Sequence, residues 1–391
     1  MKVYIAVILF LILSIPGICQ GVIPDTIISA SETIATTEIK KDKNIIAKIM
    51  DYFEESNKPK ENKKFDFSLI GGPYYSSDTK FGIGMVAAGI YRSNLSDTIT
   101  PPSEISVYAD ATSSLNFTFG VRGTHIFNSD KARLIYNANF AYNTTKFWGV
   151  GYENNIDDNN EIKYRYLSSE LEVGFLKRLL PNFFVGPIGK LHYLKGLDMQ
   201  NTRIWRNQST EILNIGAGLT IHYDTRDFLG NPSKGVFLRL DQCFNPRFFG
   251  NKYAFSLTEL SFSTYKKAWK GAIFAFCFHT RLTYGNTPWG LLSTFGGSYS
   301  MRGYYEGRFR DKCEADACLE LRQHIWRRNG LVAWIGAGTV FPKFSALRFS
   351  KVLPNYGIGY RWEFKKRVNI RLDLGFGRHQ TGFIFSINEA F

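Results

Sequence analysis

After Ile18, the chain has no apolar run of the about eighteen residues that a helix needs to cross a bilayer. Any membrane embedding must therefore use β-strands, which span only as a closed barrel because hydrocarbon leaves no partner for exposed backbone groups. The one continuous apolar run, residues 3–18, is too short and too close to the N-terminus for a spanning helix. We interpret residues 1–19 as a secretory signal peptide, cleaved before Gln20. Lipid attachment at Cys19 is the alternative, which the bulky Ile18 disfavours.

Motifs of the common enzyme families are also absent. The chain has no Gly-x-Ser-x-Gly, no His-Glu-x-x-His and no Cys-x-x-Cys. Residues 82–87 and 230–235 imitate nucleotide-binding loops, but no helix follows the first, and Val236 stands where the second needs lysine. We therefore expect no catalytic activity and no cofactor. Metal binding by the inward-facing histidines is a minor alternative; these are His222, His279 and His324.

Cysteine is scarce, and four cysteines follow the predicted signal peptide, at positions 243, 277, 313 and 318. Whether Cys313 and Cys318 are bonded stays open, because within one straight strand they would point to opposite faces. The net charge of +14 comes without a nucleic-acid recognition module, so we expect no nucleic-acid partner. Cations at a barrel rim and lumen, facing anionic lipid, account for the charge more simply.

Aromatic side chains, in contrast, are abundant: 33 Phe and 21 Tyr help to bring the aromatic share to 16%. A barrel in lipid needs an apolar outer band and aromatic girdles, which explains such a content. Near the C-terminus, alternation places Val368, Ile370 and Leu372 on one face of a strand and Arg371 and Asp373 on the other. A soluble sandwich would alternate in the same way, so the signal peptide and the aromatic content favour the barrel.

The strand-like runs number sixteen, an even number as in bacterial barrels. We predict an all-β fold, a 16-stranded transmembrane antiparallel β-barrel formed by residues 65–391. The expected strands cover residues 65–77, 80–93, 103–115, 116–127, 132–148, 163–179, 183–197, 211–226, 235–248, 253–269, 271–286, 313–328, 331–342, 354–366, 367–379 and 381–391. The longer intervals between them, which we expect to be extracellular, are residues 150–162, 198–210 and 287–312.

The segment Phe295-Gly-Gly-Ser-Tyr-Ser-Met-Arg-Gly-Tyr304 lies in the longest interval, between the eleventh and twelfth runs. It resembles the Met/Val-Arg-Gly-Phe/Tyr loop motif of the BamA/TamA family of outer-membrane β-barrel assembly proteins. Residues 223–235 resemble the Asp-x-Arg-Asp…Pro-x-x-Gly signature between the eighth and ninth strands of that family. Terminal alternation that closes on an aromatic, here Phe391, is a further mark of outer-membrane barrels. The resemblance covers the chain from about residue 65 onward.

This resemblance implies that the loop folds back into the barrel lumen, where carboxylates hold its arginine. The motif residues are Gly296, Gly297, Met301, Arg302, Gly303 and Tyr304. It further implies that Glu320 is the acid that clamps the loop, that Gly303 allows a tight turn, and that Tyr304 packs on the wall. The second acid of the family is missing, because Gly336 occupies its place. Arg302 is therefore held by Glu320 alone, or shared with another inward acid such as Asp241 or Asp373.

Residues of the second signature are Asp224, Arg226, Asp227, Pro232 and Gly235. Strand alternation places the Asp224 side chain on the inner face. For Asp227 two interpretations stay open: a role in the family signature, or a periplasmic hairpin whose charges merely face water.

The seam between the first and last strands is another candidate site. Pro73 donates no hydrogen bond and Gly71 and Gly72 carry no side chain, so the first strand should pair over only part of its length. On the last strand we expect the aromatic and aliphatic residues to face lipid, namely Phe385, Ile387 and Phe391. In the resembling family this junction opens sideways and offers a strand edge to a client protein. A strand simply ended by Gly-Gly-Pro is the alternative.

Residues 20–64 are the largest departure from the family, whose members carry periplasmic repeats, called POTRA domains, that this segment is too short to form. We expect a polar periplasmic leader with one short amphipathic helix at residues 45–53, acting as a plug, a membrane contact, a docking element or a spacer. The resemblance implies insertion or translocation of envelope proteins in the outer membrane of a Gram-negative bacterium. The implied partners are outer-membrane lipid, other assembly subunits and client proteins. A passive pore or structural anchor is the alternative.

Overall fold

The computed structural model describes residues 65–76, 80–92, 100, 102–199, 205, 207–228, 230–365 and 367–391. The predicted signal peptide (residues 1–19), the leader (residues 20–64) and the helix expected within it lie outside the described residues.

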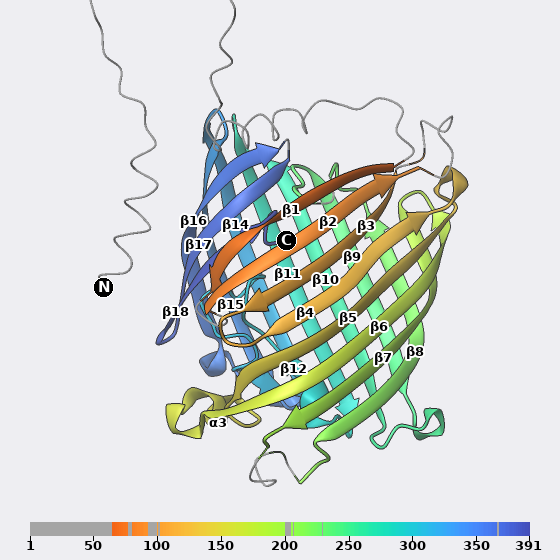
Figure 1. Ribbon diagram of the computed structural model, residues 1–391, viewed down its shortest axis with the longest axis vertical. Helices are drawn as coiled ribbons and strands as arrows, with labels where there is room; N and C mark the ends of the chain where they lie inside the picture. Colours follow the sequence, from red (N-terminus) through yellow and green to blue (C-terminus); the bar gives the residue numbers. More distant parts are fainter. Residues whose placement is uncertain are drawn as a thin grey trace, which may run out of the picture. The chain divides into compact units, whose positions relative to one another are not determined.

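Sixteen antiparallel strands form one barrel, in which each strand pairs with its neighbours along the chain (Figure 1). They are β1 (Phe65–Ser76), β2 (Lys80–Tyr91), β3 (Ser103–Thr112), β4 (Phe117–Ile126), β5 (Ala132–Phe147), β6 (Ile162–Leu180), β7 (Phe183–Leu197), β8 (Glu211–Asp224), β9 (Gly235–Asn245), β10 (Phe255–Lys267), β11 (Ala272–Gly285), β14 (Cys313–Trp326), β15 (Asn329–Phe341), β16 (Leu353–Lys365), β17 (Val368–Gly377) and β18 (Gln380–Ile387). The prediction of a 16-stranded antiparallel barrel is confirmed. Only at the C-terminus does a strand end differ from its predicted position by more than three residues, because β18 already ends at Ile387.

The two faces of the barrel follow the alternation of the sequence. Large apolar side chains such as Phe119, Leu171 and Ile335 are exposed on the outer surface. Charged side chains such as Glu320 and Asp373 are fully buried on the inner face. An apolar exterior around a polar interior is the pattern that a lipid environment imposes on a barrel. None of the described helices has the length and apolar character needed to cross a membrane.

Long connections gather at one end of the barrel. The connection from β5 to β6 contains α3 (Tyr152–Ile156), and the connection from β11 to β14 contains the two-residue strands β12 (Ser293–Thr294) and β13 (Arg310–Asp311). Inside the barrel, aromatic rings pack together that come from the end of β5, from the connection between β7 and β8, and from the connection between β11 and β14. Trp205 lies 4.2 Å from Phe147 and 4.7 Å from Trp289, between ring centroids. This part of the lumen is therefore filled by side chains.

The seam between β1 and β18 is the weakest junction of the barrel. Its register contains one pair, Ser76 with Ile384. The junctions on either side have twelve pairs, between β1 and β2, and eight pairs, between β17 and β18. Pro73 stands in register with Ile83 of β2, so β1 is paired along its whole length on that side. The partial pairing predicted for the first strand thus falls on the side of the last strand.

Candidate functional site

The motif loop runs from the end of β11 to the start of β14 and folds into the barrel. Its base is closed by β12 and β13, in which Ser293 pairs with Asp311 and Thr294 with Arg310. Above this base, apolar side chains of the loop pack with residues of α3, β15 and β16. The buried cluster contains Tyr152, Phe295, Met301, Tyr304, Phe309, Val340 and Leu353. Burial of so much apolar surface holds the loop inside the lumen, because releasing it would expose that surface to water.

Arg302 stands at the tip of this loop with no solvent exposure. Its Nη2 lies 2.5 Å from Oε2 of Glu320 on β14, and its Nη1 lies 2.7 Å from Oδ2 of Asp373 on β17. The guanidinium carbon also lies 3.7 Å from the ring centroid of Trp334 on β15. A buried cation is tolerated only when charges and hydrogen bonds compensate for the lost water, and here two carboxylates and a ring do so. The side chain of Asn355 on β16 donates a hydrogen bond to the Arg302 carbonyl.

The wall beneath the motif is made of glycine. Gly303 has a φ of 117°, and a Cβ there would lie 2.8 Å from the carbonyl carbon of Gly375 on β17. A Cβ on Gly375 would in turn lie 2.2 Å from the Arg302 oxygen, and one on Gly377 would lie 2.5 Å from the Tyr304 ring. The loop backbone can therefore lie directly on the strand. Gly296 and Gly297 also have positive φ, and the Gly297 N–H donates to the Tyr304 carbonyl.

Tyr304 fixes the far side of the motif. Its hydroxyl donates to the carbonyl of Pro354 at 2.6 Å and accepts from the N–H of Arg378 at 2.7 Å. Its ring stacks edge-on against Phe295, with the centroids 5.7 Å apart. Together, Arg302 and Tyr304 connect the loop to four consecutive strands, β14 to β17.

Further arginines and acids surround the clamp on the inner wall. Arg322 Nε lies 2.6 Å from Oε1 of Glu320, and Arg361 Nη1 lies 2.5 Å from Oδ1 of Asp373. Glu389, which follows β18, lies 2.8 Å from Nε of Arg361. Each clamping acid thus accepts from two arginines, which stabilises it as a carboxylate in the buried wall.

Phe391 corrects one sequence-based prediction. It does not face lipid: the chain leaves the sheet after Ile387, and Arg322 Nη2 donates to the Phe391 main-chain oxygen at 2.9 Å. The Phe391 ring lies 6.0 Å from Tyr299 of the motif loop and 6.4 Å from Tyr265, between centroids. The physical reason is that Glu389 and the Phe391 oxygen satisfy buried arginines, which outweighs the lipid contact of one ring. Phe385 remains within β18 opposite Leu372, whereas the Ile387 side chain lies outside the described residues.

The second signature forms a compact turn between β8 and β9. Asp224 pairs with Arg226 at 2.8 Å, and Arg226 lies over the Phe237 ring at 4.1 Å. Asp227 accepts hydrogen bonds from the Ser233 N–H and hydroxyl, which outweigh partial burial and keep the pKa of its carboxyl well below its usual range. Pro232 is buried, and a Cβ on Gly235 would lie 2.3 Å from the Thr225 oxygen.

This turn reaches other parts of the barrel rim. Asp227 pairs with Arg367 in the turn between β16 and β17 at 2.8 Å. The carbonyl of Gly230 lies 3.5 Å from the Glu389 N–H. The hairpin is therefore joined to the C-terminal wall rather than facing water alone.

Two alternatives for the second clamping acid are separated by the structure. Asp373 contacts Arg302, whereas Asp241 lies in another cluster, with Lys190 Nζ at 2.8 Å and Arg239 Nη2 at 2.7 Å. Cys313 and Cys318 are free thiols in the same strand. Gly71 lies against Met85 of β2, and a Cβ on Gly72 would meet no atom within 4 Å among the described residues.

Sequence reasoning missed Trp334, Asn355 and Glu389 as parts of the site. Their signal was weak: Trp334 and Asn355 are single polar-capable residues on strands rich in small and apolar residues, and Glu389 is one acid in the last few residues of the chain. The glycines at 375, 377 and 382, close in sequence to Asp373, were the feature that could have located the contact surface, because a loop backbone needs such a wall.

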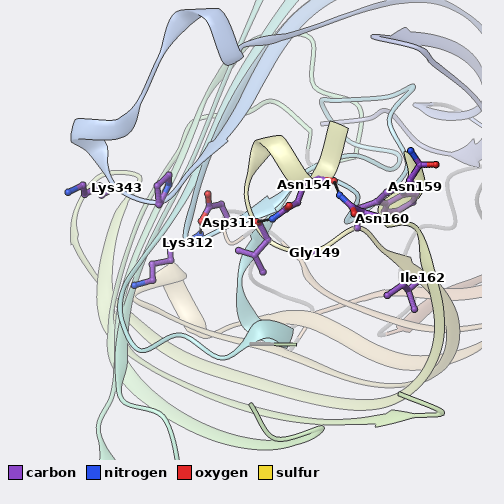
Figure 2. Close-up of a pocket in the computed structure, with 11 residues that line it drawn as sticks. Gly149, Asn154, Asn159, Asn160, Ile162, Asp311, Lys312 and Lys343 are labelled. Carbon is purple, nitrogen blue, oxygen red and sulfur yellow. Dashed lines mark hydrogen bonds between the residues drawn. The ribbon is translucent and has the colours of Figure 1, made fainter. Parts of the chain in front are cut away.

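An open pocket of about 710 Å³ lies at the base of the motif loop (Figure 2). Asp311 and Lys312 line it from the loop, Asn154 and Asn159 from the connection between β5 and β6, and Lys343 from the connection after β15, close to Lys312 (Figure 2). The pocket does not include Arg302, so it is separate from the clamp.

Comparison with known proteins agrees with this architecture. Residues 101–391 match the Omp85 superfamily domain. No curated protein matches the chain by sequence. Among solved structures, the chain is similar to BamA from Haemophilus ducreyi lacking POTRA domains 1–3, with a TM-score of 0.55 and 12% identity over 84% of this chain and 70% of that one.

Two further solved structures share the fold. CdiB from Acinetobacter baumannii has a TM-score of 0.52 and 13% identity over 84% of this chain and 60% of that one. CdiB from Escherichia coli has a TM-score of 0.55 and 11% identity over 83% and 63%. The chain thus spans less than two thirds of either CdiB protein. On the strength of the domain match, supported by the sixteen-stranded barrel and its inserted loop, the chain belongs to the Omp85 superfamily and is a Gram-negative outer-membrane β-barrel protein.

Proposed function

We propose that this barrel inserts or translocates envelope proteins across or into the outer membrane, and that clients engage it at the seam between β1 and β18. The observation that carries the proposal is the single register pair, Ser76 with Ile384, at that junction. A backbone hydrogen bond contributes about 1 kcal/mol net in water, and its loss costs more in lipid. Separating β1 from β18 therefore costs several-fold less than separating β17 from β18, which has eight pairs.

A separated seam offers strand edges to another chain. An extended client segment could add to β1 or β18 through main-chain hydrogen bonds, which makes the recognition largely independent of client sequence. Exposed edges are otherwise a liability in natural sheets, so a weak junction inside an otherwise fully paired barrel favours a functional role.

The motif loop supports this role from inside. Arg302 joins β14 to β17 through Glu320 and Asp373, and Tyr304 joins β16 to the turn after β17. The loop therefore holds strands β14 to β17 together, and these strands form the part of the wall next to β18 and the seam. We propose that the clamp confines opening to the β1–β18 junction and prevents the neighbouring strands from separating.

The test is a reversible disulfide bond that joins β1 to β18 across the seam; we call it the seam tether. Ser76→Cys and Ile384→Cys are combined in a background whose native cysteines are alanine, and the oxidised protein is reconstituted in proteoliposomes. Opposite residues of an antiparallel pair lie within disulfide range. A urea-unfolded eight-stranded outer-membrane protein is the client probe, and its folding is followed by heat-dependent gel mobility. We expect the untethered barrel to accelerate folding several-fold, the oxidised tether to abolish most of that gain, and dithiothreitol to restore it.

A matched control places the same tether in a fully paired junction, with Ala88→Cys and Ser106→Cys between β2 and β3. This control should retain the acceleration. An untethered barrel that leaves client folding unchanged would refute the insertion proposal. Acceleration that survives the seam tether would refute the seam route. The alternative, a passive pore, predicts a large steady conductance in planar bilayers that Arg302→Ala leaves unchanged.

A further inference from the structure

Three side chains with metal-binding groups meet on the inner wall where β11 pairs with β14. His279 stands in register with Asp316, and Glu314 stands two residues before Asp316 on the same face. Their ligand atoms all lie within 4.8 Å of one another. Nδ1 of His279 is 2.7 Å from Oε1 of Glu314 and 3.8 Å from Oδ2 of Asp316. None of the three contacts Arg302, so the cluster is separate from the clamp.

Glu314 is the feature that points to a ligand. Its side chain has no solvent exposure, and its Oε2 has no hydrogen-bond partner among the described residues. Among the described residues, its one ion pair joins Oε1 to the imidazole nitrogen of His279. A buried carboxylate loses several kcal/mol of hydration, which one imidazole on one oxygen compensates only in part. Oε2 is left without a donor among the described residues.

His279 is oriented as a ligand. Its Nε2 lies 3.5 Å from Oε1 of Glu259 on β10, which leaves Nδ1 turned toward Glu314 and Asp316. In metal sites, a ligating histidine commonly donates its other ring N–H to a carboxylate, which fixes the tautomer and strengthens the donor nitrogen. Glu259 is in place for that role.

We propose that His279, Glu314 and Asp316 bind a divalent transition-metal ion of the zinc class. Bond lengths of about 2.1 Å in a tetrahedral site place ligand atoms roughly 3.4 Å apart, so the three groups need to move by less than about 1 Å. One imidazole nitrogen with two carboxylates suits zinc, whereas calcium and magnesium prefer oxygen ligands alone. Two carboxylates balance the charge of the ion, and three protein ligands leave the fourth position of a tetrahedral site for a water molecule.

The site is also coupled to the motif loop. Ser300, two residues before Arg302, donates a hydrogen bond from its hydroxyl to Oδ1 of Asp316. The Tyr299 ring lies 6.5 Å from the His279 ring, between centroids. An ion that fixes Asp316 through its other oxygen would therefore hold the acceptor for Ser300 in place. The metal site strengthens the attachment of the loop to β14.

The first experiment measures the metal directly. Full-length protein in detergent is stripped with EDTA, dialysed against micromolar zinc chloride and analysed by mass spectrometry for zinc per chain. We expect about one equivalent in the wild type and a loss of at least tenfold in affinity in His279→Ala and in Glu314→Gln. His192→Ala is the matched control, because that lumen histidine lies beside the single carboxylate of Glu170, at 3.6 Å. It should keep the full equivalent.

Heat-dependent gel mobility shows whether each variant is folded. If a variant does not fold, cobalt binding to the wild-type protein still tests the proposal. Wild-type protein loaded with cobalt should show the visible absorption of a tetrahedral nitrogen and oxygen site. Absence of both zinc uptake and that absorption in the wild type overturns the proposal. Full zinc retention in folded His279→Ala or Glu314→Gln overturns it as well.

A second experiment tests the coupling. Limited trypsin digestion of the loop, at Arg302, Arg308 and Arg310, is followed with and without zinc. We expect zinc to slow cleavage several-fold in the wild type and to have no effect in His279→Ala. Equal rates with and without zinc in a wild type that binds one equivalent would overturn the coupling to the loop.

Discussion

At the scale of single residues, Arg302 has the most unusual surroundings in the described part of the chain. Its guanidinium is fully buried and contacts two fully buried carboxylates, Glu320 and Asp373. Breaking a buried pair by removing one partner costs about 3–5 kcal/mol, because the other charge is left without compensation. An exposed pair contributes about 1 kcal/mol or less. The difference in these magnitudes makes the clamp testable.

Arg302→Ala should release the motif loop, since two buried carboxylates would then lack their shared cation. We expect new protease cuts between residues 294 and 311 and a loss of heat resistance on gels. Lys195→Ala is the control, because Lys195 belongs to an exposed pair with Glu211 at 3.8 Å and should leave both measurements unchanged. Wild-type digestion and heat resistance in Arg302→Ala would rule out the inserted-loop clamp as a source of stability.

Gly375→Ala tests the same contact without changing any charge. A Cβ there would lie 2.2 Å from the Arg302 oxygen, so the loop must shift away from β17. We expect protease sensitivity of the loop close to that of Arg302→Ala. In the control Gly189→Ala, the nearest atom lies 4.0 Å from the added carbon, and digestion should match the wild type. A resistant loop in Gly375→Ala would mean that the wall is more adaptable than its glycines indicate.

At the scale of elements, the register between β11 and β14 brings Cys277 directly opposite Cys318. Both thiols are buried and free. Opposite residues in an antiparallel pair have Cα atoms about 4.5–5.5 Å apart, which is within the range of a disulfide. A shift of one residue would send the two side chains to different faces.

Oxidation with diamide should therefore link Cys277 to Cys318 and consume two of the four thiols that the structure describes. Peptide mapping should identify this bond, and Cys277→Ser should prevent it. Cys313→Ser serves as the control and should leave the bond intact. Recovery of a Cys313–Cys318 disulfide instead would contradict the register of this strand pair.

The C-terminal segment is the second element with a distinct role, because Glu389 connects Arg361 and Asn369 on the inner wall. Glu389→Ala should lower heat resistance, since Arg361 and Arg322 lose a buried carboxylate. Glu211→Ala, which removes an exposed acid, is the control. Unchanged heat resistance in Glu389→Ala would indicate that Asp373 and Glu320 satisfy these arginines alone.

At the scale of the whole molecule, alternation and turn residues determined the strand count and nearly every strand boundary, because lipid outside and charge inside impose a period of two on all sixteen strands. The position of the motif loop followed from that count. The partners of Arg302 did not all follow: Glu320 came from the resemblance, whereas Asp373 and Asp241 could be separated only by where the loop tip lies. The prediction that Phe391 faces lipid was wrong, because alternation does not show where a strand ends. It also does not show that a buried arginine, Arg322, binds the main-chain oxygen of Phe391.

The role of the leader also belongs to the scale of the whole molecule. Residues 20–64 lie outside the described residues, so their role stays a prediction from the sequence. If its amphipathic segment plugs the lumen or docks a partner, deletion of residues 22–60 should leave a heat-resistant barrel but change conductance or the proteins recovered from native membranes. A heat-resistant deletion variant with unchanged conductance and unchanged partners would leave a spacer as the role of this segment.

The turn between β8 and β9 has a consequence for motion. Asp227 ties this turn to Arg367, between β16 and β17, and the Arg367 side chain is 34% exposed. If the seam opens, the strands next to it swing outward, and this tie must lengthen or break. A partly exposed ion pair weakens as dissolved salt screens it, within a Debye length of about 8 Å at physiological ionic strength. The ionic strength of the solution at this rim thereby becomes a variable in how readily the barrel opens, and dilute medium would favour the closed form.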